Sequence, residues 1–303
     1  MKPYWSGVFP AITTQMNRDG SINFEATAAH IEVLLASGVA GMVMLGSLGE
    51  NQMLDSDEKR HVLDMAVQVI EGRVPVLCGV AETSTEAAVR FVEDGEKIGA
   101  DGYMVMPAMC YKTPDPAETL AHLRTTAKAT GLPIMVYNNP ISYGNDITPE
   151  MFAELAKVKN LVALKESSGD TRRITDLLRV CGDRYALITG VDPLALESAI
   201  LGIDGWVAGT GIAFPEQNQY LWELMKAGEW DKARAIYRWF TPLLHLDTCV
   251  KFVQTIKLCV QECGLGTEWT RAPRLPLAGA ERKRVLKVIH EGIETRPKVP
   301  KRK

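Results

Sequence analysis

Short apolar runs recur along the first two thirds of the chain, and longer amphipathic segments separate them. Runs of this length, bounded by glycine or proline, are typical of strands that are buried on both faces. The predicted strands are residues 7–14, 42–45, 75–80, 103–106, 133–137, 161–165, 185–189 and 206–208. Because these strands alternate with helical segments, the pattern predicts a parallel sheet.

The junction from helix to strand has the same chemistry at three places. A helical segment ends at glycine, a short turn follows and an apolar strand begins, as in Gly38-Val-Ala-Gly41, Gly99-Ala-Asp-Gly102 and Gly202-Ile-Asp-Gly205. Such a junction is half of a β-strand–α-helix unit. Eight units in about 210 residues predict a closed (β/α)₈ TIM barrel of the α/β class rather than an open sheet. The sequence does not favour a dinucleotide-binding fold, because no Gly-x-Gly-x-x-Gly motif follows the first strand.

The alternation stops after about Pro215. Residues 215–228, 230–246, 249–264 and 280–294 are predicted to be helices without strands between them. We therefore expect a barrel domain over residues 1–228 and a small C-terminal helical region over residues 229–303. The basic, proline-containing segment 296–303 is expected to be a solvated tail.

Composition limits the classes of protein to consider. The chain has 303 residues, of which 46% are hydrophobic and 23% are charged, so it can form a sizeable core. A net charge of −3 argues against nucleic acid and against an anionic membrane surface as partners. The sequence has neither an apolar run of the roughly 20 residues that a membrane helix needs nor a signal-peptide pattern, so a cytoplasmic protein is expected. Its six cysteines are widely spaced and are expected to be reduced core thiols.

A lysine follows the apolar part of the sixth predicted strand. Leu161–Leu164 is followed directly by Lys165, and the polar turn Ser167–Asp170 comes next. The active site of a (β/α)₈ barrel lies at the C-terminal ends of its strands. A lysine that loses its water there has a lowered pKa and can attack a ketone or imine carbon to form a Schiff base. Taken alone, the stretch equally fits a lysine that extends into solvent.

Two other strand ends carry polar side chains. Ser47 lies between Gly46 and Gly49, where free backbone N–H groups could hold a carboxylate, although an ordinary tight turn fits equally well. Tyr137 ends the fifth strand and could transfer protons if its pKa were lowered towards neutrality, although a core tyrosine is the simpler interpretation. Tyr137 and Lys165 lie at the same height on adjacent strands, so we expect them to meet.

The sequence offers little support for other chemistries. The five histidines, at 30, 61, 122, 245 and 290, lack the spacing of metal ligands, and His245 is expected to be structural. A Gly-x-Ser-x-Gly nucleophile turn and a phosphate-binding glycine–lysine loop are both absent from the sequence. We therefore predict neither a metal nor a cofactor.

Three motifs in this order resemble the dihydrodipicolinate synthase / N-acetylneuraminate lyase family of class I, Schiff-base-forming aldolases and dehydratases. They are Gly46-Ser-Leu-Gly-Glu50, Tyr137-Asn-Asn-Pro140 and Leu164-Lys-Glu-Ser-Ser-Gly-Asp170, and the resemblance covers nearly the whole chain. It implies a barrel with a helical C-terminal extension, usually assembled as a homotetramer, that acts on a small 2-oxo acid or cyclic imino acid.

The resemblance also implies roles for individual residues. Lys165 would form the imine without a cofactor, Tyr137 would shuttle protons, and Ser47 with its neighbouring N–H groups would receive the substrate carboxylate. The implied substrate-binding positions are Ser47, Leu48, Gly49, Asn139, Gly190 and Gly209.

The chain departs from the synthases of this family at three places. Leu48 stands where a second hydroxyl residue is common, and Ile141-Ser142-Tyr143 stands where the synthases carry an arginine for a substrate carboxylate. The synthases also have a tyrosine pair after the fourth strand, with one ring reaching into the neighbouring subunit, whereas here Tyr111 comes late. We therefore expect a different activity on the same scaffold.

Within the family, the chain is most similar to the branch that deaminates 1-pyrroline-4-hydroxy-2-carboxylate in hydroxyproline breakdown. The features behind this resemblance are Met135–Pro140, Lys165–Arg173, Trp239–Asp247 and Ile256–Cys259. It implies a lyase or hydrolase that releases 2-oxoglutarate semialdehyde and ammonia. The alternatives are a dihydrodipicolinate synthase, a 2-oxo-3-deoxy sugar acid aldolase or dehydratase, and a non-enzymatic carboxylate-binding barrel.

Overall fold

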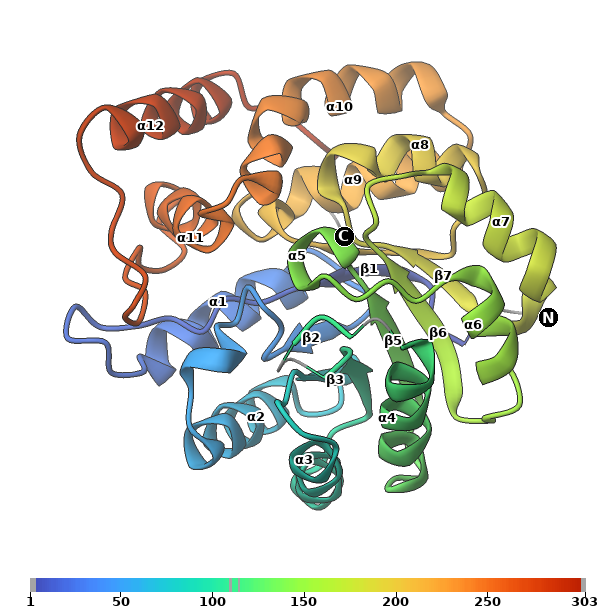
Figure 1. Cartoon of the computed structure of the whole chain (residues 1–303). Helices are drawn as coiled ribbons and strands as arrows, with labels where there is room; N and C mark the ends of the chain where they lie inside the picture. The colour runs from blue at the N-terminus through green and yellow to red at the C-terminus, as the bar shows by residue number, and fades with distance from the viewer. Residues whose placement is uncertain (1–3, 109–110, 114, 301–303) are drawn as a thin grey trace.

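Eight parallel strands form one sheet that curves into a barrel (Figure 1). The structure is a computed structural model, and it describes residues 4–108, 111–113 and 115–300. The strands are β1 Gly7–Pro10, β2 Met42–Met44, β3 Val76–Val80, β4 Gly102–Val105, β5 Ile134–Asn138, β6 Leu161–Glu166, β7 Ala186–Thr189 and β8 Gly205–Ala208. Their order around the sheet is β1-β8-β7-β6-β5-β4-β3-β2. The predicted (β/α)₈ TIM barrel is therefore confirmed.

The ring closes just after β1. Ala11 donates its N–H to the Ala208 carbonyl at 2.8 Å, and the next residue, Ile12, donates to the Val43 carbonyl at 3.0 Å. The chain thus changes its partner from β8 to β2 at this point. The predicted first strand, residues 7–14, is too long for this reason, because regular pairing with β8 ends at Pro10.

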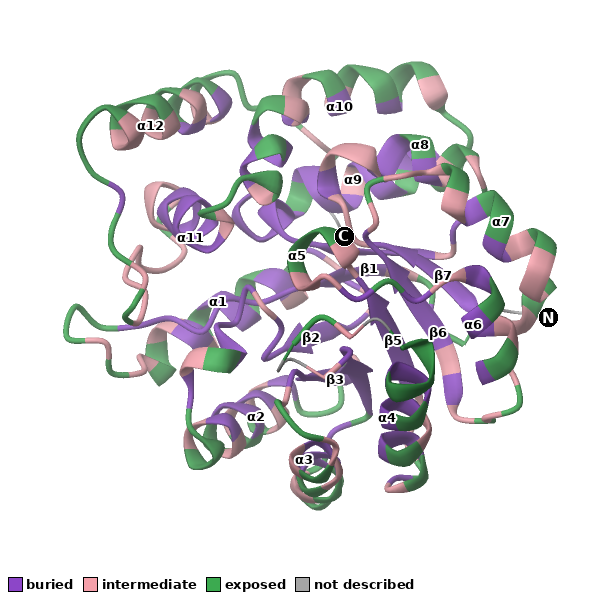
Figure 2. Ribbon diagram, in the orientation of Figure 1, coloured by how far each residue is buried: buried purple, intermediate pink, exposed green. Residues whose placement is uncertain are grey.

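Helices follow the strands, and most of them cover the outside of the barrel. They are α1 Phe24–Ala36, α2 Ser56–Ile70, α3 Thr85–Ile98, α4 Pro116–Lys128, α5 Pro140–Tyr143, α6 Pro149–Leu155, α7 Arg172–Cys181, α8 Ala195–Ile200 and α9 Pro215–Lys226. Figure 2 shows buried strands inside and exposed outer faces on the helices. The glycine stops act as predicted, since Gly99 ends α3 with a φ of 111° that other residues rarely adopt.

Short 3₁₀ helices lie at several strand ends. They are η1 Asn51–Met53, η2 Gly182–Arg184, η3 Asp192–Leu194 and η4 Thr210–Ala213. The turn after β2 does not lead directly into an α-helix. Instead η1 comes first, and α2 begins at Ser56 with Asp55 as its N-cap.

The C-terminal helices pack together on one side of the barrel (Figure 1). They are α10 Trp230–Leu244, η5 His245–Thr248, α11 Phe252–Glu262 and α12 Gly279–Glu294. The helices predicted over 230–246 and 249–264 are both shorter than expected, because η5 and a turn separate them. Gly228 lies between α9 and α10, and the domain boundary at residue 228 stays a prediction. Of the described helices, none is both long and apolar enough to span a membrane.

Candidate active site

A cavity of about 180 Å³ opens where the barrel strands end. It is smaller than the ~300–1,000 Å³ of pockets that hold drug-sized ligands, so it suits a small metabolite. Every predicted site residue except Gly49 lines it, namely Ser47, Leu48, Tyr137, Asn139, Lys165, Gly190 and Gly209.

Lys165 points into this cavity instead of into solvent. Its side chain is buried, with 6% of its surface exposed, and its Nζ lies 4.0 Å from the centre of the Tyr137 ring. The two residues are paired in register between β5 and β6, as predicted. Burial lowers the pKa of Lys165, and the charge of Asp247 opposes this effect. A lowered pKa gives the amine the neutral form that attacks a carbonyl or imine carbon.

Gly190 makes the room that Lys165 occupies. It follows β7, and a Cβ atom at this position would lie 2.1 Å from Cε of Lys165 and 2.3 Å from Oγ of Ser167. Both distances are far shorter than van der Waals contact. The position predicted for substrate binding is therefore also a packing requirement of the lysine.

Tyr137 belongs to a group of hydroxyl side chains. Tyr143, on α5, has its ring edge-on to that of Tyr137, with centroids 5.7 Å apart, and its hydroxyl is hydrogen-bonded to Ser47. The two tyrosine hydroxyls also lie close enough for each to affect the pKa of the other. The hydroxyls of Tyr137, Tyr143 and Ser47 thus form a chain within one subunit.

The sequence made proton transfer by Tyr137 conditional on a lowered pKa, and the structure does not supply that condition. Burial raises the pKa of Tyr137, and it also raises that of Tyr143. Both phenols therefore hold their protons in the free site. A hydroxyl chain of this kind can still carry protons, because each member receives one proton as it gives up another.

Asn139 supports Tyr137 through its side chain. Its Nδ2 donates to the Tyr137 hydroxyl at 3.0 Å, and its Oδ1 accepts from the Ser142 N–H at 3.0 Å as the N-cap of α5. Both ends of the amide are engaged, so the observed geometry favours a role in holding Tyr137.

The loop after β2 presents Gly46, Ser47 and Leu48 to the cavity. Among the hydrogen bonds of the described residues, the N–H groups of Ser47 and Leu48 have no protein acceptor. Two adjacent amides of this kind can bind a carboxylate. The Gly49 carbonyl accepts from the Thr14 hydroxyl, and a Cβ atom at this position would lie 3.1 Å from backbone atoms of Ile12 and Leu45. Gly49 does not line the cavity, and its predicted role in substrate binding stays a prediction.

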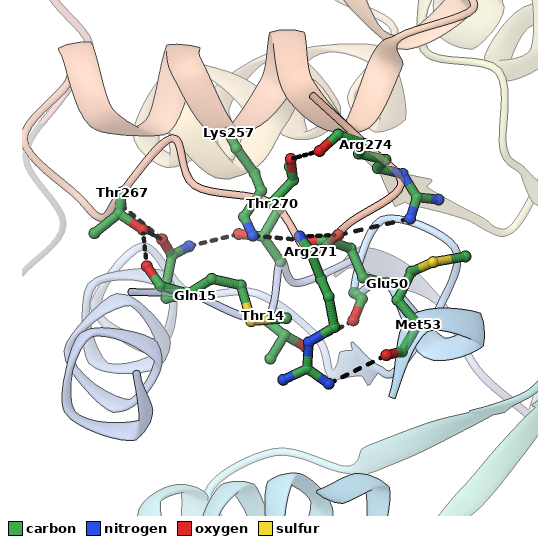
Figure 3. Close-up of polar contacts among 12 residues, drawn as sticks. Thr14, Gln15, Glu50, Met53, Lys257, Thr267, Thr270, Arg271 and Arg274 are labelled. Atoms are coloured by element: carbon green, nitrogen blue, oxygen red, sulfur yellow. Dashed lines mark hydrogen bonds and ion pairs between the residues drawn. The ribbon is translucent and has the colours of Figure 1, made fainter. Parts of the chain in front are cut away.

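A buried ion pair fixes the far end of this loop (Figure 3). Lys257, on α11, donates to Glu50 at 2.7 Å, and both side chains are fully buried. Glu50 also accepts the Arg271 N–H at 3.1 Å, and the Arg274 guanidinium lies 3.6 Å away. Glu50 has a φ of 57°, a left-handed conformation that these contacts hold in place. The C-terminal region thereby positions Ser47 and Leu48.

Asp247 brings a carboxyl group into the cavity from η5. Gly209 makes the room for it, because a Cβ there would lie 2.4 Å from Asp247 Oδ1. Burial raises the pKa of Asp247 well above its usual range, and the nearby charge of Asp192 adds to this effect. Asp192 is itself held by the Trp206 Nε1–H at 2.9 Å and by the N–H groups of Gly209 and Thr210.

Sequence reasoning missed Tyr143 and Asp247 as site residues. Tyr143 was noted only as standing where an arginine was expected, and its position six residues after Tyr137 on the same loop was the available signal. Asp247 closes the Trp239–Asp247 motif, but no local pattern connects it to Lys165. His245, in the same 3₁₀ helix, is exposed and does not line the cavity.

Cysteine placement needs one correction. Cys78 and Cys259 are buried free thiols as predicted, whereas Cys249 is exposed and lines the cavity, because it lies on the turn between η5 and α11. Cys110 lies outside the described residues. Among the described residues, no group of three or more His, Cys, Asp or Glu side chains is placed to hold a metal ion. The predictions of no metal and no cofactor stay predictions.

Comparison with known proteins gives one consistent result. Residues 4–292 match the model of the dihydrodipicolinate synthetase family. The chain is 31% identical over 293 residues to the 4-hydroxy-tetrahydrodipicolinate synthase of Phenylobacterium zucineum, covering 95% of this chain and 98% of the relative. It is 34% identical over 242 residues to the enzyme of that name from Methanospirillum hungatei, covering 79% and 82% of the two chains.

Comparison with solved structures points to the same family. The chloride-inhibited dihydrodipicolinate synthase of Acinetobacter baumannii, complexed with pyruvate, superposes with a TM-score of 0.90 at 25% identity, over 95% of this chain and 98% of that one. The dihydrodipicolinate synthase of Bacillus anthracis gives a TM-score of 0.91 at 26% identity, over 98% and 100% of the two chains. With its barrel, its buried lysine and these matches over nearly its full length, the chain belongs to the dihydrodipicolinate synthetase family.

Proposed function

We propose that this protein forms a Schiff base between Lys165 and the C2 carbon of a small 2-oxo acid or cyclic imino acid. The observation that carries the proposal is the buried Lys165 amine, with its lowered pKa, 4.0 Å from the ring of Tyr137 in a metabolite-sized cavity. Burying an amine costs stability. A binding protein would gain nothing in return, whereas an enzyme uses the reactivity of the buried amine.

The finer proposal is deamination of 1-pyrroline-4-hydroxy-2-carboxylate. Of the described residues that line the cavity, Lys165 is the single cation and Asp247 the single carboxyl group. The Ser47 and Leu48 amides suit one substrate carboxylate, whereas the Asp247 side of the cavity offers no cation for a second. A monocarboxylate whose far end carries a hydroxyl and an amine fits this distribution of charge.

The reaction begins at the ring carbon that bears the carboxylate. The Lys165 amine adds to C2 of the pyrroline, the C2–N1 bond breaks, and the ring opens to a Schiff base with a free amine on C5. Loss of a C3 proton gives the enamine, which expels the 4-hydroxyl as water. Proton transfers then place an imine at C5. Two waters are consumed in hydrolysing the C5 and Lys165 imines, which releases ammonia and 2-oxoglutarate semialdehyde.

Protons must reach C3 and the Lys165 nitrogen during these steps. Tyr137 is paired with Lys165 in strand register, and the hydroxyls of Tyr143 and Ser47 continue from it. We assign proton transfer near Lys165 to these three hydroxyls and carboxylate binding to the loop of Ser47 and Leu48.

Dihydrodipicolinate synthase activity is the second candidate, and the names of the relatives favour it. This reading requires a site for a second carboxylate, for which residues 141–143 offer no arginine. Aldolase or dehydratase activity on 2-oxo-3-deoxy sugar acids would use the same lysine and tyrosine.

The family resemblance also suggests a homotetramer. All the groups named in this mechanism come from one chain, so the mechanism does not require a neighbouring subunit. Tyr111, the residue closest to the position of the synthase tyrosine pair, is exposed and its hydroxyl contacts Glu118. Light scattering on the purified protein would give the number of subunits.

Borohydride trapping and product analysis test the proposed function. Protein treated with borohydride and either pyruvate or the hydroxy-pyrroline acid should gain one adduct per chain, at Lys165. Lys165→Ala should give no adduct and lose nearly all turnover, whereas Lys157→Ala, at an exposed lysine ahead of the same strand, should behave as wild type. Ammonia and 2-oxoglutarate semialdehyde should appear from the hydroxy-pyrroline acid.

Two results would contradict the proposal at different levels. An adduct at another lysine, or none with either compound, would reject the Schiff base on Lys165. Trapping with pyruvate together with condensation of pyruvate and aspartate semialdehyde, but without ammonia release from the hydroxy-pyrroline acid, would establish the synthase instead.

A further inference from the structure

Lys165 has proton-bearing groups on both sides. Strand β6 lies between β5 and β7 in the sheet, and Tyr137 belongs to β5. On the opposite side, Gly190 and Gly209 follow β7 and β8, and Asp247 packs against Gly209. The cavity therefore has a hydroxyl side and a carboxyl side, with the reactive amine between them.

The cavity extends from Lys165 to the carboxyl side, where Val191, Val207 and Asp247 line it. The rings of Tyr137 and Tyr143 line the hydroxyl side, whereas Gly190 and Gly209 on the other side leave the room that Lys165 and Asp247 occupy. With its carboxylate on the loop of Ser47 and Leu48 and its C2 on Lys165, a five-carbon chain would extend C4 and C5 towards Asp247.

We propose that Asp247 is the catalytic acid for loss of the 4-hydroxyl and then the base that takes a proton from C5. This inference rests on the proposed deamination and assigns one of its steps to a residue. The protonated carboxyl gives its proton to the hydroxyl as the C4–O bond breaks. The enamine electrons move to form C3=C4 and the C2 iminium, and water leaves. The resulting carboxylate then removes a C5 proton, and that electron pair returns through C4=C5 and C2=C3 to the Lys165 nitrogen.

The electrostatic setting suits an acid that acts at this moment. Burial and the charge of Asp192 favour the protonated form of Asp247, while the positive charge of Lys165 favours its ionised form. When Lys165 is part of a neutral enamine, that positive charge is gone. Asp247 is therefore most strongly protonated at the stage where the hydroxyl needs a proton.

Asp192, the other carboxyl group nearby, is unsuited to this task. Its oxygens accept from Trp206, Gly209 and Thr210, and the residue is fully buried behind Gly209. These contacts make Asp192 a structural group that sets the charge around Asp247.

Asp247→Asn is the direct test, because the amide keeps the size of the side chain and cannot give up a proton in the same way. With pyruvate and borohydride, this variant should be trapped as wild type is, since imine formation does not use Asp247. With the hydroxy-pyrroline acid, kcat should fall by roughly 10²–10⁴-fold. The adduct trapped by borohydride should still carry the 4-hydroxyl. Mass spectrometry should find it heavier than the dehydrated adduct by the mass of one water.

His245→Gln is the matched control, because His245 is exposed on the same 3₁₀ helix and lies outside the cavity. It should turn over the hydroxy-pyrroline acid at the wild-type rate. Gly209→Ala is the second variant, because its methyl group would displace the Asp247 carboxyl without changing any acid or base. It should accumulate the same hydroxylated adduct. If Asp247→Asn does not fold, Gly209→Ala still tests whether Asp247 is the acid.

The outcomes separate this inference from the proposed function. If wild type releases ammonia and Asp247→Asn does so within a few-fold of its rate, or accumulates the dehydrated adduct, Asp247 is not the acid and the deamination proposal stands. If wild type is trapped with pyruvate but never opens the hydroxy-pyrroline acid, both proposals fail together.

Discussion

Tyr143 connects two residues that the sequence motifs already marked. Its hydroxyl is hydrogen-bonded to Ser47, and its ring packs edge-on against Tyr137. Ser47 therefore reaches Tyr137 through Tyr143. Because burial raises the pKa of both tyrosines, each can pass a proton on only when it is resupplied from the next hydroxyl.

Removing the Tyr143 hydroxyl should break this chain. We expect Tyr143→Phe to lower kcat by about 10²-fold or more while changing KM little, because the ring remains and proton transfer is lost. Tyr111→Phe is the matched control, since Tyr111 is exposed and its hydroxyl contacts Glu118. Steady-state kinetics of both variants would test this role of Tyr143. A large loss of kcat in Tyr111→Phe, with normal kinetics in Tyr143→Phe, would assign proton transfer to Tyr111 instead.

At the scale of elements, the loop after β2 depends on a helix more than 200 residues further along the chain. Lys257 on α11 neutralises Glu50, which has a left-handed backbone and ends the loop that carries Ser47 and Leu48. Figure 3 shows how Arg271 and Arg274 approach the same carboxylate. A buried pair of this kind adds little net stability by itself but becomes costly when one partner is lost.

Lys257→Met should therefore destabilise the protein by about 3–5 kcal/mol, because it leaves Glu50 charged and buried. Urea unfolding would measure the loss, and Glu50→Gln combined with Lys257→Met should recover part of it. Lys251→Met is the control, because Lys251 pairs with Glu281 at the surface and should cost no more than about 1 kcal/mol. Equal effects of the two lysine variants would contradict a special role for the buried pair.

The stability of the whole molecule should depend on pH through His30. This histidine lies on α1, is fully buried, and donates from Nε2 to the Ile212 carbonyl of η4 at 2.9 Å. Burial lowers its pKa from the ordinary 6.5 to about 4. The unfolded chain therefore binds more protons than the native protein between these two values, so stability falls as the pH drops through this window.

His30→Gln should remove this contribution, which is roughly 3 kcal/mol between pH 6.5 and 4. Gln keeps an N–H donor for Ile212 and does not titrate. Urea unfolding at several pH values should show a shallower acid loss in this variant, while His61→Gln, at an exposed histidine on α2, should follow the wild-type curve. Parallel curves for wild type and His30→Gln would show that the buried histidine is not the cause.

The sequence by itself determined the barrel and the pairing of Tyr137 with Lys165 at the ends of its strands. Apolar runs and glycine stops are local signals, because strand burial and helix ends depend on neighbouring residues, and the barrel follows from their alternation. Tyr137 and Lys165 could be paired in advance because both end adjacent parallel strands, where register leaves little freedom.

Only the tertiary structure decided which other side chains reach Lys165. Tyr143 reaches the cavity on the short helix α5 and Asp247 on a 3₁₀ helix of the C-terminal region, whereas Gly49 does not line it. These directions depend on how segments far apart in the chain pack together. A pattern of neighbouring residues carries no record of that packing, so the second acid of the site could not be found without it.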